Sequence, residues 1–237
     1  MAFDPARILY EDNHLIAVNK LSGELVQPDT TGDPALEDTV KEFIRLRDAK
    51  PGNVFLGVVH RIDRPVSGAV IFAKTGKALA RLNEMLKNGE IKKIYWAITE
   101  AAPDPESGTL VHHLVRDGKT NKSKVYTKPV KESKEARLNY RLLAGSDNYH
   151  LVEVELLTGR HHQIRAQLSS IGARIKGDLK YGAARSNRDG SISLHSRSLE
   201  FPHPVAKDDG GHRNLVRITA PVPQSDNLWH YFETAVK

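Results

Sequence analysis

The stretch His60-Arg61-Ile62-Asp63-Arg64-Pro65-Val66-Ser67-Gly68 lies between two apolar runs, residues 54–59 and 69–74. Short apolar runs of this kind predict buried strands. The stretch would then be a polar turn at the end of buried strands, where catalytic side chains are often presented. An ordinary aspartate paired with Arg61 or Arg64 fits the composition equally well. The residue types alone therefore leave Asp63 open between a catalytic and a structural role.

Strand-like runs continue along the chain, and many alternate apolar and polar residues. They cover residues 7–11, 15–19, 54–59, 69–74, 94–99, 110–115, 124–127, 137–143, 150–156 and 215–220. Three segments have helical spacing: one begins at Pro34 with Asp33 as N-cap, one covers 77–88 before Gly89, and one begins near His161. Strands outnumber helices and do not alternate with them regularly. We therefore predict an α+β fold with a mixed, largely antiparallel β-sheet flanked by helices and loops.

Each predicted helix has apolar residues that would face a core. They are Leu36, Val40 and Ile44 in the first, Leu79, Leu82 and Leu86 in the second, and Ile164, Leu168 and Ile171 in the third.

Length and composition exclude several classes of protein. The chain has 237 residues, enough to bury a core without disulfides, and it contains no cysteine. A disulfide framework, a Cys-ligated metal cluster and a thiol nucleophile are therefore excluded. The longest apolar runs are far too short to span a bilayer of roughly 30 Å, so we expect no membrane contact. The first residues contain no apolar signal core, and we expect a cytoplasmic protein.

Positive charge gathers in two parts of the chain. Residues 116–141 carry nine Lys and Arg against three Asp and Glu, and residues 160–217 carry eleven against five. Clustered basic side chains favour a polyanionic partner, because binding releases condensed counterions. Charge alone does not distinguish DNA, RNA and phospholipid.

The stretch 60–68 resembles the HRLDxxTSG motif of the RluA-type pseudouridine synthases, and residues 68–75 resemble the strand that follows this motif. Other segments resemble further motifs of the family in the same order. They are residues 8–20 (opening strands), 93–97 (KxYxA), 157–165 (LTGRxHQIR), 175–182 (PIxGDxxYG) and 194–204 (LHA…FxHP). Departures from the family pattern are Leu21 for Pro, Val66 for Thr, His161 for Thr and Gln167 for His.

The resemblance covers almost the whole chain and implies the pseudouridine synthase fold. It implies a single catalytic domain over residues 1–237, without the S4-type RNA-binding domain that often precedes it in the family. The implied protein is an isomerase that converts uridine to pseudouridine in a stem-loop of ribosomal or transfer RNA. We expect the protein to act as a monomer. We also expect no cofactor, because the reaction neither gains atoms nor changes redox state.

The resemblance also assigns catalytic roles. Asp63 would be the nucleophile, attacking C1′ or C6, and a glycal route is also open. Arg165 would lie against this aspartate and keep it ionised, because a nearby guanidinium lowers a carboxylate's pKa. Tyr95 would lie against the uracil with its hydroxyl near C5. The structural alternatives are that Arg165 is an ordinary surface arginine and that Tyr95 packs in the core.

Candidates for RNA contacts come from the same motifs and from the basic segments. They are Arg61, Arg64, Arg160, His162, Lys122, Lys124, Arg174 and Lys176. The family's counterpart of Arg61 can fill the place of a base taken out of the stack, although a structural pair is the alternative.

A metal-dependent enzyme and an RNA-binding module without catalysis are the alternative functions. The chain has eleven histidines, but neighbouring histidines on a strand point to opposite faces and no HExxH spacing occurs, so we expect no metal site. An RNA-binding module without catalysis would use the same basic segments. Such a module has no need of an Arg/Asp cluster at the end of buried strands.

Overall fold

Two units, each with its own cluster of buried hydrophobic side chains, make up the chain in the computed structural model, which describes residues 2–207, 210–224 and 226–236. The first unit contains Met1–Ile91 and Ser196–Pro221, and the second contains Lys92–His195 and Val222–Lys237. The chain therefore enters each unit twice.

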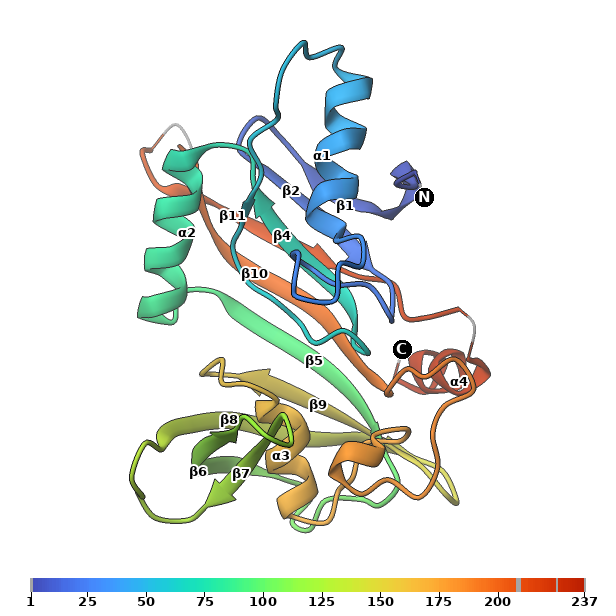
Figure 1. Cartoon of the computed structure of the whole chain (residues 1–237). Helices are drawn as coiled ribbons and strands as arrows, with labels where there is room; N and C mark the ends of the chain where they lie inside the picture. The colour runs from blue at the N-terminus through green and yellow to red at the C-terminus, as the bar shows by residue number, and fades with distance from the viewer. Residues whose placement is uncertain (1, 208–209, 225, 237) are drawn as a thin grey trace. The chain divides into compact units, whose positions relative to one another are not determined.

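The first unit carries the stretch around Asp63. Its elements are a 3-10 turn η1 (Pro5–Arg7), strands β1 (Ile8–Glu11), β2 (Leu15–Lys20), β3 (Gly57–Val58), β4 (Ser67–Ala73), β10 (Leu194–Lys207, from Ser196 onward) and β11 (Arg213–Thr219), and helices α1 (Leu36–Arg47) and α2 (Gly76–Asn88). Strand β2 lies between β1 and β4, β4 also neighbours β10, and β10 pairs with β11 (Figure 1). Strand β3 pairs with β4. The β1–β2, β2–β4, β3–β4 and β10–β11 pairings are antiparallel.

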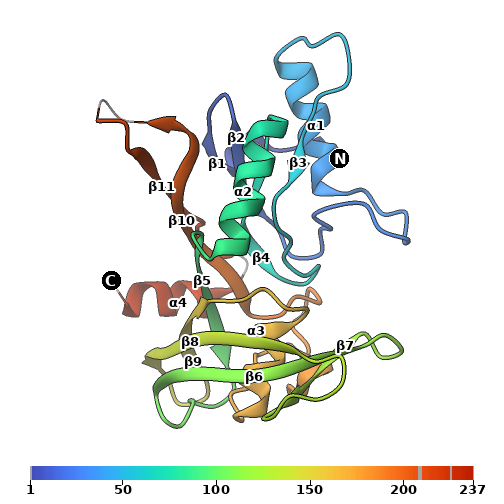
Figure 2. The same cartoon turned by 90° about the vertical axis from the view of Figure 1, so that its left-hand side faces the viewer.

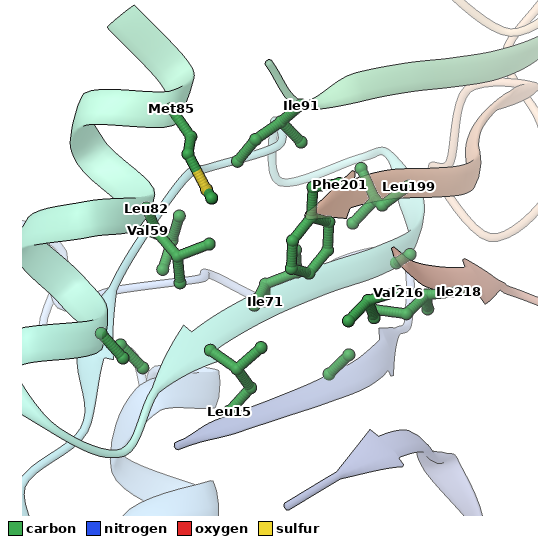
Figure 3. Close-up of a cluster of buried hydrophobic side chains, with 14 of the residues drawn as sticks. Leu15, Val59, Ile71, Leu82, Met85, Ile91, Leu199, Phe201, Val216 and Ile218 are labelled. Carbon is green, nitrogen blue, oxygen red and sulfur yellow. The ribbon is translucent and has the colours of Figure 1, made fainter. Parts of the chain in front are cut away.

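The core of this unit lies between α2 and the sheet. Leu82 of α2, Ile71 of β4 and Phe201 of β10 are completely buried in one cluster (Figure 3). Burial of a side chain of this size contributes about 1.5–3 kcal/mol relative to its exposure in water. This core holds β4, and with it the end of the Asp63 stretch.

The second unit carries both basic segments for most of their length. Its elements are strands β5 (Lys92–Thr99), β6 (Ser107–Asp117), β7 (Lys122–Tyr126), β8 (Lys134–Gly145) and β9 (His150–Leu156), helices α3 (Gln163–Ser170) and α4 (Asn227–Ala235), and the 3-10 turn η2 (Leu179–Tyr181). The strands follow the order β5-β9-β8-β6-β7, and every neighbouring pair is antiparallel. Helix α3 packs against β6 and β7 (Figure 2). Trp96 of β5 and the α4 residues Trp229 and Phe232 are buried in a separate cluster.

The predicted α+β class with largely antiparallel strands is confirmed, and the described residues contain four α-helices. Helix α2 ends at Asn88 as predicted, and Gly89 caps it with a φ of 74°. Its buried face differs from the prediction, because Ala78, Leu82 and Met85 are buried while Leu79 and Leu86 are only partly buried. No helix in the described ranges is both long and apolar enough to cross a membrane.

The predicted start of the first helix is wrong, and the third helix begins two residues after His161. Helix α1 begins at Leu36 with Ala35 as N-cap, because Ala35 is held extended by a bridge to Leu25. The Asp33 carboxylate instead accepts a hydrogen bond from Arg64. Helix α3 begins at Gln163, because its N-cap residue has a left-handed φ of 50°.

The strand predictions have one overestimate and one omission. Only Gly57–Val58 of the predicted strand 54–59 is a strand, and β10 was not predicted. Strand β10 contains Pro202 and Pro204, and prolines argue against a strand because they cannot donate to a ladder. Helix α4 was also not predicted.

Candidate active site

Asp63 lies in the connection between β3 and β4 of the first unit. It is half-buried and follows the buried Ile62. The amide of Val66 donates a 3.0 Å hydrogen bond to the carbonyl oxygen of Asp63, which closes a turn around the aspartate. The strand that begins at Ser67 therefore follows directly on a turn of defined shape.

A buried lysine fastens this turn to the end of β2. The ammonium of Lys20 is completely buried and donates to the carbonyl oxygens of Leu21 (2.9 Å), Arg64 (3.0 Å) and Val66 (2.7 Å). Burial lowers the pKa of Lys20 to about 7, and the negative charges of Glu24 and Asp63 oppose that shift. The three carbonyl acceptors match the three donors of an ammonium group.

Both ends of the stretch 60–68 have their own constraint. At the first end, Nε2 of His60 accepts a 3.2 Å hydrogen bond from the amide of Ile71 in β4. At the other end, Gly68 has a φ of 114°, and a Cβ there would lie 2.3 Å from the carbonyl oxygen of Ser196. Only glycine fits this position without displacing backbone.

The two arginines beside Asp63 differ in their surroundings. Arg64 donates to Asp33 Oδ2 at 2.7 Å and to the carbonyl oxygen of Gly23 at 2.9 Å. It therefore braces the turn, which is a structural role beside the predicted RNA contact. Arg61 is exposed.

The second unit carries the other two predicted catalytic residues. Tyr95 lies in β5 opposite Val154 of β9 and is 6% exposed. Arg165 lies in α3 and is 5% exposed. Its Nε and Nη2 donate to the two carboxylate oxygens of Asp178 at 2.7 and 2.8 Å. Such a bidentate pair fixes the plane of the guanidinium.

A ring cluster adjoins this ion pair. The guanidinium carbon of Arg165 lies 5.1 Å from the ring centroid of Tyr181, whose hydroxyl lies 3.0 Å from Nδ1 of His162. The His162 ring stacks on that of His161 with the centroids 3.8 Å apart. Burial, aided by the positive charge of Arg165, lowers the pKa of His162 to about 2. His162 is therefore neutral at pH 7 and would meet RNA as a neutral group.

The basic residues of the second unit that we predicted to contact RNA differ in how closely other groups of the protein surround them. Lys122 and Lys124 lie in β7, and Lys124 lies 3.5 Å from Asp117. Arg160 donates through Nε to the carbonyl oxygen of Glu135 at 2.8 Å.

Among these residues, Lys176 and Arg174 differ most in their contacts and exposure. The ammonium of Lys176 lies 2.7 Å from Oδ1 of Asn187, 3.3 Å from a carboxylate oxygen of Asp226 and 5.9 Å from the ring centroid of Tyr149. These contacts indicate a structural role for Lys176. Arg174 is exposed.

The structure thus assigns Asp63, Arg61 and Arg64 to the first unit, and every other predicted site residue to the second. Sequence reasoning missed Lys20 and Asp178 as the partners that hold the Asp63 turn and Arg165. A lysine ending the apolar run 15–19 was a signal for the first of them. Within the described ranges, no group of three or more His, Asp or Glu side chains is placed to hold a metal ion.

Comparisons with known proteins agree with the fold and the motifs. The protein titled Human RNA Pseudouridylate Synthase Domain Containing 4 shares the fold with a TM-score of 0.77 at 21% identity, over 98% of this chain and 93% of that one. This chain therefore has the pseudouridylate synthase fold. A sequence model described as RNA pseudouridylate synthase matches residues 14–170. The chain belongs to the RNA pseudouridylate synthase family.

Two curated relatives show the degree of similarity. The protein named Uncharacterized RNA pseudouridine synthase slr1629 of Synechocystis sp. is 34% identical over 92% of this chain. The protein named Ribosomal large subunit pseudouridine synthase D of Zymomonas mobilis is 32% identical over 85% of it. The chain spans about two thirds of these relatives, 66% of the length of each.

Proposed function

We propose that this protein isomerises uridine to pseudouridine in RNA, with Asp63 as the nucleophile. The observation that carries the proposal is the turn around Asp63, which combines a family motif with a backbone held by the buried Lys20 and by Gly68. A structural aspartate does not require such a rigid support. A nucleophile does, because misplacement of about 1 Å can reduce the rate 10²-fold.

The reaction balances with groups of this chain alone. The N1–C1′ bond breaks, the uracil turns, and a C5–C1′ bond forms; C5 then loses its proton, and N1, which carries none in uridine, gains one. Asp63 would attack C1′ or C6, or act in a glycal route. Arg165 would favour the ionised form of Asp63, and the Tyr95 hydroxyl would take part in removing the C5 proton.

We further propose a stem-loop of ribosomal or transfer RNA as the substrate. The name of the Zymomonas mobilis relative makes large-subunit ribosomal RNA the first substrate to test. The protein would act as a single catalytic domain, as a monomer, in the cytoplasm and without a cofactor.

The test compares the unchanged protein with Asp63→Asn and with Asp147→Asn, an exposed control carboxylate in the second unit. Pseudouridine is mapped in total RNA from cells lacking the gene and complemented with each form. We expect the control to restore a modification that Asp63→Asn does not restore, because an amide cannot act as the nucleophile. Equal restoration by Asp63→Asn would reject the nucleophile. No modification dependent on the gene would favour an RNA-binding module without catalysis.

A further inference from the structure

The two basic parts of the sequence meet at one residue of the second unit, Asn121. The ammonium of Lys180, from η2, donates to the carbonyl oxygen of Asn121 at 3.3 Å. The guanidinium of Arg116, at the end of β6, donates through Nη2 to Oδ1 of the same residue at 3.1 Å. Cations from segments far apart in the chain therefore contact the same turn.

The backbone on both sides of this meeting point is held in place. The Tyr181 hydroxyl accepts a 2.7 Å hydrogen bond from the amide of Ser123 in β7. The Ser123 hydroxyl donates to the carbonyl oxygen of His161 at 2.6 Å. Asn121 itself has a left-handed φ of 49°, a conformation that asparagine tolerates better than most residues. The two cations are thus presented by a turn of defined shape.

The cations around Asn121 differ from Lys124, whose ammonium lies near the carboxylate of Asp117 in the same turn. In the part of the chain that the structure describes, no carboxylate lies within 4.0 Å of the charged groups of Arg116, Lys122 or Lys180. The acid of the turn, Asp117, accepts hydrogen bonds from the amides of Lys119 and Thr120 and lies 3.5 Å from Lys124.

The field of these charges also reaches the neighbouring ring cluster. The positive charges of Lys180 and Arg116 both contribute to lowering the pKa of His162, after burial, Arg165 and His161. Arg116 is exposed and Lys180 is half-buried. An anion at the turn would therefore meet accessible cations that are not neutralised.

We propose that Arg116 and Lys180, which both donate to Asn121, and Lys122, which follows Asn121 in the chain, bind phosphate groups of the RNA backbone; we call these four residues the Asn121 cluster. The proposal rests on the proposed function in taking RNA as the partner. A guanidinium binds a phosphate through paired donors, and an ammonium binds it as a point charge. Contacts of this kind position an RNA without reading its sequence.

The test uses a uridine-loop RNA hairpin as the probe and measures its Kd at several salt concentrations. The variants are Arg116→Gln and Lys180→Gln, and the control is Lys87→Gln, an exposed lysine in the last turn of α2 in the first unit. Each cluster variant should reduce the slope of log Kd against log salt by roughly 0.7–0.9, because one phosphate contact is lost. The control should leave the slope unchanged.

Asn121→Asp provides an independent variant. It keeps the size of the side chain but places a carboxylate beside both cations, so it should weaken RNA binding with an unchanged circular dichroism spectrum. Unchanged salt slopes in both glutamine variants would overturn the proposal. It would also be overturned if these variants lost binding to anionic lipid vesicles as strongly as they lost binding to the RNA hairpin.

The proposal and the proposed function fail differently. If the unchanged protein forms pseudouridine while the glutamine variants keep the full salt slope, the Asn121 cluster is rejected and the enzyme stands. If the slopes fall but the unchanged protein never forms pseudouridine, the cluster stands and the enzymatic proposal is rejected.

Discussion

The ammonium of Lys20 donates a 2.7 Å hydrogen bond to the carbonyl oxygen of Val66, the residue whose amide closes the turn of Asp63. Lys20 ends β2, and Val66 precedes β4, the strand that pairs with β2. The position of the Asp63 turn is therefore set by the buried amino group of a lysine in the neighbouring strand. A change at Lys20 should affect both folding and turnover.

Lys20→Met should destabilise the first unit. It removes the donor shared by three carbonyl groups, and each buried acceptor left unpaired costs about 1–3 kcal/mol. We expect a loss of about 2–4 kcal/mol in the free energy of unfolding and a lower turnover of the folded protein. Urea unfolding of this variant and of Lys77→Met, an exposed lysine of α2, measures the difference. Equal stability of the two variants would contradict the role of Lys20.

The buried neutral His162 should make the protein sensitive to acid. Its pKa is about 2 in the native state and ordinarily 6.5, so between these values the unfolded chain binds a proton that the native protein does not bind. Stability from this group is complete above pH 6.5 and falls by about 1.4 kcal/mol per pH unit below it. Urea unfolding at pH 7 and 5 should show that His162→Gln loses about 2 kcal/mol less than the unchanged protein. Parallel pH profiles would disprove this effect.

Asp178→Asn should break the buried ion pair with Arg165. It leaves a guanidinium that is 5% exposed without its carboxylate, and removing one partner of such a pair typically costs about 3–5 kcal/mol. The double variant Asp178→Asn/Arg165→Met should recover part of that stability, because it no longer buries a guanidinium that has lost its bidentate carboxylate. A double-mutant cycle with thermal unfolding measures the coupling. A coupling energy near zero would show that the pair contributes nothing.

Tyr95→Phe should separate the last proton transfer from the earlier steps. It keeps the ring but removes the hydroxyl proposed to act at C5, and proton-transfer catalysis of this kind is worth about 10²–10⁴ in rate. RNA tritiated at uridine C5 should release little label, while acid-quenched RNA still shows a broken N1–C1′ bond or a stalled adduct. Asp63→Asn should show neither. Near-normal tritium release by Tyr95→Phe would make Tyr95 a stacking or packing residue.

Local sequence signals determined the elements that depend on neighbours along the chain. The run 150–156 alternates apolar and polar residues and is strand β9 with those bounds. Gly89 ends α2 because a left-handed cap suits glycine and few other residues. Asp63 could be predicted as a candidate catalytic residue because its motif is a contiguous stretch of the sequence.

The tertiary structure decided the partners of the charged residues. Lys20 meets the carbonyl of Val66 46 positions away, and Lys180 meets Asn121 59 positions away. Lys176, predicted to contact RNA, lies against Asn187 and Asp226, contacts that its sequence does not reveal. A lysine or arginine is the same letter in a sequence whether it binds a ligand or a buried carbonyl. Only the folded chain determines which acceptors lie within hydrogen-bonding distance, because those acceptors come from segments that the turns and sheets bring together.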